Sequence, residues 1–72
     1  MTVFNLVEKW IIRDDLYLYR FASHYGVDIN FAKLKKQVIT VGLVQEIAAR
    51  VEDADFLIYE SYGLIYVYEF KI

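Results

Sequence analysis

The chain has 72 residues and a formal net charge of −2, and 58% of its residues are apolar and 18% aromatic. This length predicts one compact domain over residues 1–72, with little room for a substrate pocket beside a hydrophobic core. The acidic balance argues against a protein that coats nucleic acid, and charged residues recur too often for a membrane-spanning segment. The absence of cysteine and of a signal-peptide pattern predicts a cytoplasmic location.

The first predicted element is a helix over residues 3–12, with Thr2 as its N-cap. Apolar residues recur in it at the spacing of one helical face: Val3, Leu6, Val7, Trp10 and Ile11.

A second helix can begin at Asp14 or Asp15, because an aspartate side chain caps the free amides of a first helical turn. Gly26 would end it in the left-handed conformation. Its inward face would consist of Leu18, Phe21, Ala22 and Tyr25. Residues 10–21 also fit a hairpin with the two aspartates as its turn, because leucine and tyrosine alternate after them.

The next segment predicts a helix over residues 30–38, opened by Asp28 or Asn30. Residues 37–41 are rich in β-branched side chains and fit a strand, a helix end or a packed joint. An amphipathic helix follows over residues 43–52 and ends at an acidic run. Its inward side would carry Leu43, Ile47, Ala48 and Val51.

Residues 55–70 predict a hairpin, which makes the chain an α+β domain: a helical N-terminal two-thirds packed on a C-terminal antiparallel β-hairpin. We expect a three-residue loop, Ser61 to Gly63, with the glycine at positive φ. In the resulting register, one face carries Leu57, Tyr59, Ile65 and Val67 and packs on the helices. The opposite face carries Phe56, Ile58, Tyr66, Tyr68 and Phe70.

That second face is a large apolar surface, and a soluble chain must cover it. The domain itself, a second copy or another partner can cover it, and we predict a homodimer because aromatic side chains are enriched at interfaces. The expected function is a non-enzymatic protein-interaction module, of the kind found among small phage- or virus-encoded inhibitors and regulators.

No group of residues predicts catalysis, a metal or a cofactor. His24 is the only histidine and there is no cysteine, so one chain cannot assemble the usual zinc ligands. The acidic residues 52–55 lack the spacing of a calcium loop, and the three glycines are isolated, unlike those of a phosphate-binding loop. We therefore expect no enzymatic activity.

The segment FASHYGV, residues 21–27, resembles the centre of a helix-turn-helix motif, and the order of elements is similar to that of a winged-helix domain. The resemblance implies a DNA-binding transcription regulator that uses residues 16–39, with residues 30–38 as recognition helix and the hairpin as wing. Lys35 departs from the pattern, since an apolar residue is expected there. Phosphate contacts would then come from Lys33, Lys35 and Lys36.

Overall fold

A computed structural model describes residues 5–71, which form three strands and three helices. In chain order the elements are β1 (Asn5–Ile12), α1 (Asp15–His24), α2 (Phe31–Leu34), α3 (Val41–Ala48), β2 (Asp55–Ser61) and β3 (Leu64–Lys71). The strands form one antiparallel sheet with β3 between β1 and β2. Helices packed on an antiparallel sheet confirm the predicted α+β class.

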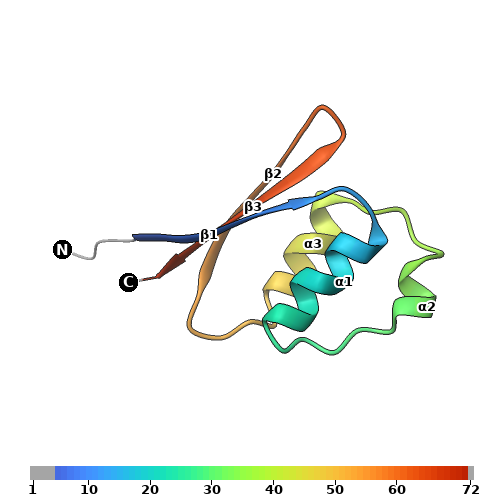
Figure 1. Cartoon of the computed structure of the whole chain (residues 1–72), viewed down its shortest axis with the longest axis horizontal. Coiled ribbons are helices and arrows are strands. Elements are labelled where there is room, and N and C mark those ends of the chain that lie inside the picture. Colours follow the sequence, from blue (N-terminus) through green and yellow to red (C-terminus); the bar gives the residue numbers. More distant parts are fainter. Residues whose placement is uncertain (1–4, 72) are drawn as a thin grey trace.

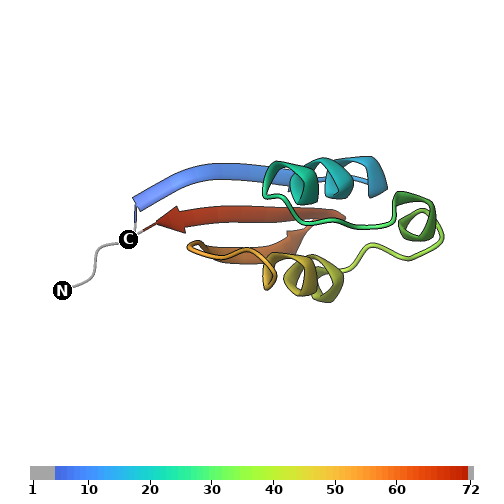
Figure 2. The same cartoon turned by 90° about the horizontal axis from the view of Figure 1, so that it is seen from below.

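The helices all lie on one side of the sheet, as Figure 1 shows. Helix α1 contacts β1 and helix α3 contacts β2, so the two helices lie along opposite edges of the sheet in Figure 2. The side of the sheet that faces away from the helices is uncovered in the described part of the chain.

The predicted helix over residues 3–12 is wrong, because residues 5–12 form the edge strand β1. Trp10 pairs with Val67 and Ile12 pairs with Ile65, which leaves Ile12 only 2% exposed. The apolar spacing of this segment fits a helix. As a strand, however, the segment gains backbone hydrogen bonds to β3 and buries its C-terminal end, and these tertiary interactions outweigh the local preference. The predicted cap at Thr2 lies outside the described residues.

Helix α1 confirms its predicted cap and end, and Leu18, Phe21 and Ala22 of its predicted inward face are buried, whereas Tyr25 is half-buried. The Asp14 side chain accepts a hydrogen bond from the Tyr17 amide at 3.1 Å, and Gly26 follows the helix with φ +73°. The alternative hairpin is therefore wrong: residues 10–12 are strand but pair with β3, and residues 15–21 are helical.

The predicted helix over residues 30–38 is reduced to the four residues of α2. Asn30 caps it by accepting a hydrogen bond from the Lys33 amide at 3.2 Å, as expected. Val38 lies beyond it and is 83% exposed. Residues 37–40 connect α2 to α3 without regular secondary structure, so neither the strand nor the helix end is observed there. The Thr40 hydroxyl caps α3 by accepting a hydrogen bond from the Leu43 amide.

The hairpin turn contains two residues, Tyr62 and Gly63, and the predicted three-residue loop is wrong. Both residues have positive φ, +51° and +77°, which is the geometry of a type I′ turn. Ser61 therefore pairs with Leu64, and the register of β2 moves by one residue from the expected one. Because side chains alternate along a strand, this shift exchanges the two faces of β2.

The core lies between the sheet and the helices. Phe21 is its largest fully buried side chain, and the Phe56 ring lies 5.7 Å from it at an angle of 77°. The buried apolar residues are Ile12, Leu18, Phe21, Ala22, Val27, Leu34, Val44, Ile47, Ala48, Ile65 and Val67.

Candidate protein-binding surface

The uncovered side of the sheet is the best candidate for a functional surface, and its residues follow from the strand register. Every second residue of a strand points to the same face, and the pairs Lys9–Tyr68, Leu57–Tyr68, Ile11–Tyr66 and Tyr59–Tyr66 place these side chains opposite the core. We call this surface the open face. It consists of Leu6, Lys9, Ile11, Asp55, Leu57, Tyr59, Ser61, Leu64, Tyr66, Tyr68 and Phe70.

The open face exposes large apolar side chains. Leu6 is 57% exposed, Leu57 53% and Tyr59 39%, and the aromatic residues of β3 are half-buried between their neighbours. Monomeric proteins seldom leave a continuous apolar patch of more than a few hundred Å² in water. The open face is therefore a candidate binding surface.

Three tyrosines form an ordered stack across β2 and β3. The Tyr59 ring lies 5.1 Å from that of Tyr66 and 6.0 Å from that of Tyr68, with 11° between the planes in both pairs. The hydroxyl oxygens of Tyr59 and Tyr68 lie 3.4 Å apart, and this hydrogen bond raises the pKa of Tyr59 and lowers that of Tyr68. The Lys9 ammonium lies 5.4 Å from the ring centres of Tyr66 and Tyr68.

Only two charged residues belong to the open face, and they lie on opposite edges of the sheet. Lys9 is on β1 and Asp55 is on β2, with β3 between them. Within residues 5–71, neither side chain forms an ion pair.

The structure separates the predicted interface residues into two groups. Tyr66, Tyr68 and Phe70 lie on the open face as expected. Phe56 and Ile58 instead face the helices and pack against the core, because the two-residue turn shifts β2 by one position. This placement corrects their assignment to the exposed side.

Sequence reasoning missed the residues that replace them on the open face. Leu57 and Tyr59 take the place of the two core residues on β2, and Leu6, Lys9 and Ile11 come from β1. The adjacent residues Tyr62 and Gly63 were the available signal, since a glycine at the second position suits a type I′ turn. The three residues from β1 were missed because this segment was predicted to be a helix rather than a strand.

The lysines that would contact DNA are exposed, but the expected recognition helix is reduced to the four residues of α2. Lys33 lies in α2, and Lys35 and Lys36 follow its last turn. A helix of four residues is too short to present side chains along a DNA groove. Helix α3 has no lysine or arginine. The winged-helix resemblance stays a prediction, and the helix that it assigns to DNA recognition has only four residues.

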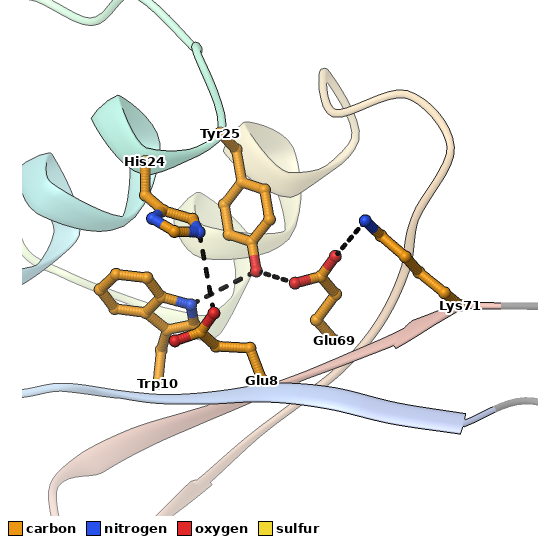
Figure 3. Close-up of polar contacts among 6 residues, drawn as sticks. All are labelled: Glu8, Trp10, His24, Tyr25, Glu69 and Lys71. Atoms are coloured by element: carbon orange, nitrogen blue, oxygen red, sulfur yellow. Dashed lines mark hydrogen bonds and ion pairs between the residues drawn. The ribbon is translucent and has the colours of Figure 1, made fainter.

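A second cluster, of polar side chains, lies on the helix side of the sheet and is shown in Figure 3. The Tyr25 hydroxyl donates a hydrogen bond to Glu69 and accepts one from Trp10 Nε1 at 3.3 Å. Glu69 is only 3% exposed, and the Lys71 ammonium lies 3.8 Å from its second oxygen. Burial, followed by the hydrogen bond to Glu69, raises the pKa of Tyr25 above its ordinary value.

This cluster joins the C-terminal end of α1 to β1 and β3. His24 extends it, since its Nε2 lies 3.7 Å from a carboxylate oxygen of Glu8 and both side chains are about half exposed. A shallow groove of about 560 Å³ lies beside the cluster and is also lined by Arg50. Residues 5–71 contain no group of three histidine or acidic side chains placed to hold a metal ion. The interactions support a structural role.

Comparison with models of known families, with curated proteins and with solved structures finds no match to this chain. No helix in the described residues is long and apolar enough to cross a membrane.

Proposed function

We propose that the protein is a non-enzymatic protein-binding module that self-associates through the open face. The observation that supports this proposal is the position of the aromatic residues: the structure has helices on one side of its sheet and a mostly apolar surface on the other. Covering that surface removes apolar area from water, and each Å² of buried apolar area contributes about 25 cal/mol of favourable free energy.

The tyrosine stack supports binding as well as burial. Tyr59, Tyr66 and Tyr68 already hold one another in a stacked arrangement, so little side-chain entropy is lost when a partner covers them. Tyrosine also tolerates water before assembly, because its hydroxyl group remains hydrated while its ring is available to a partner. These properties are common in residues that dominate the energy of an interface.

Sedimentation equilibrium tests the proposal, and we expect the wild-type protein to be dimeric at micromolar concentration. Tyr66→Glu should give a folded monomer, because its carboxylate would be buried without a partner in the dimer and hydrated in the monomer. Tyr19→Glu is the matched control: Tyr19 is 37% exposed on α1, away from the open face, and its replacement should leave the dimer intact. A wild-type protein that is monomeric at high concentration would contradict self-association.

The sequence predicts no catalytic group, so we look for the function in binding to other proteins. We infer a module that regulates or inhibits a protein partner, with the helix side directed outward from the dimer. The cytoplasmic location expected from the composition stays a prediction.

A further inference from the structure

Charge placement on the open face carries a further inference, which rests on the proposed self-association. We propose that two copies pack face to face about a two-fold axis parallel to β3, so that β1 of each copy lies over β2 of the other. In this arrangement Lys9 of each copy meets the partner's Asp55. The dimer then contains two equivalent ion pairs, one along each side of its aromatic centre.

The strand register places these two residues two positions apart along the strands, on opposite edges of the sheet. Lys9 and Leu57 both pair with Tyr68, so they lie in the same row across the sheet. Asp55 lies two residues from Leu57 along β2, a distance of about 7 Å. A two-fold axis along β3 exchanges the two edges and keeps the rows level, which brings Lys9 over the partner's Leu57 and beside the partner's Asp55. Packed sheets lie about 10 Å apart, and a lysine and an aspartate side chain together can cross this gap.

The other simple orientation is unfavourable. A two-fold axis in the plane of the interface but across the strands would place β1 over β1 of the partner. The Lys9 side chains of both copies would then lie near each other in a mostly apolar interface, with no carboxylate beside them. Like charges brought together in this way oppose association.

Lys9 itself requires an anion once the face is covered. In the isolated chain its ammonium group lies over two tyrosine rings and remains exposed to water, without an ion pair in residues 5–71. A second apolar sheet would remove much of that water, and an unpaired ammonium is costly to bury. Asp55 is the acidic residue of the open face, so a second copy supplies the missing charge.

The available area agrees with a pair of identical chains. Leu6, Leu57 and Tyr59 are 57%, 53% and 39% exposed, and the half-buried side chains beside them add further area. The open face is thus on the order of the 500 Å² per copy that a small symmetric dimer buries. Specific interfaces begin at about 1,000 Å². The face is therefore large enough for a dimer of modest affinity, in which two ion pairs have a measurable effect.

Charge reversal tests the orientation by sedimentation equilibrium at low salt. Lys9→Glu alone and Asp55→Lys alone should each weaken self-association by about tenfold, because each places two like-charged pairs in the homodimer. An equimolar mixture of the two variants should associate about as tightly as wild type, since both contacts in the mixed dimer are then attractive. The double variant Lys9→Glu with Asp55→Lys should also recover. Lys33→Glu, with the same change of net charge outside the open face, should associate like wild type.

The outcomes separate the orientation from the self-association on which it rests. Weaker self-association of each single variant, together with wild-type affinity in the mixture, supports the proposed pairing of Lys9 with Asp55. If Tyr66→Glu dissociates the dimer but neither charge reversal affects it, the orientation is overturned and the binding face stands. If the single variants weaken the dimer and the mixture does not recover, the two residues do not meet, which also overturns the orientation. A monomeric wild-type protein overturns both proposals.

Discussion

Tyr25→Phe removes one hydroxyl group, and the structure predicts a large effect on stability. That hydroxyl donates a hydrogen bond to Glu69, whose side chain is almost completely buried. A hydrogen bond to a charged group contributes about 1.5–3 kcal/mol, and a buried acceptor left without its donor costs a similar amount. Trp10 Nε1 also loses its acceptor, but it is only partly buried and water can replace it. We therefore expect the free energy of unfolding to fall by about 2–3 kcal/mol.

For a domain of this length, such a loss is a large part of the total stability. A change of 1 kcal/mol shifts the melting temperature of a 60–100-residue domain by about 4–8 °C, so a loss of about 2–3 kcal/mol should lower the melting temperature by about 8–24 °C. Calorimetry and urea unfolding measure the two quantities. Tyr19→Phe is the matched control, because it removes the same group from a more exposed side chain on α1 and should change stability by less than about 0.5 kcal/mol.

The pH dependence gives an independent check on the same hydroxyl group. The pKa of Tyr25 is raised above its ordinary value of 10, first by burial and then by Glu69, so folding favours the neutral phenol. Its contribution is complete below pH 10 and is lost as the pH rises further, because the unfolded chain then ionises while the folded chain does not. The stability difference between wild type and Tyr25→Phe should therefore narrow above pH 10. A variant within 0.5 kcal/mol of wild type, or a difference unchanged from pH 7 to 11, would refute this reasoning.

Two further predictions concern the register and the core. Ile58→Asp should unfold the domain because Ile58 faces the helices, whereas Leu57→Asp, one residue away on the open face, should keep the fold and weaken only self-association. Circular dichroism measures the fold of each variant, and sedimentation equilibrium measures its self-association. The opposite result would support the register with a three-residue loop. Trp10→Ala should lower stability by about 3 kcal/mol in urea unfolding, because Trp10 packs edge-on against Phe21 and contributes a hydrogen bond to Tyr25; stability equal to wild type would remove Trp10 from the packing between sheet and helices.

The sequence was sufficient where a local interaction determines the structure. The caps at Asp14 and Asn30 and the end of α1 at Gly26 depend on hydrogen bonds or backbone angles within a few residues. The alternation along β3 was also predictable, so Tyr66, Tyr68 and Phe70 were assigned to the correct face.

The sequence was insufficient where distant segments compete. Residues 5–12 have the apolar spacing of a helix, and only pairing with β3, more than fifty residues later, makes them a strand. The assignment of Phe56 and Ile58 failed for a different reason, because one residue of loop length decides which side of β2 faces the core. The hydrogen bond between Tyr25 and Glu69 joins residues 44 positions apart, and no local pattern indicates it.

An isotope-filtered NOE experiment on a mixture of labelled and unlabelled protein tests most directly whether the open face is the surface through which the chain associates. The account predicts intermolecular NOEs from the ring protons of Tyr59, Tyr66 and Tyr68 and from the methyl groups of Leu57, and none from core residues such as Val44. Intermolecular NOEs confined to the helix side, or none at all at millimolar concentration, would contradict it.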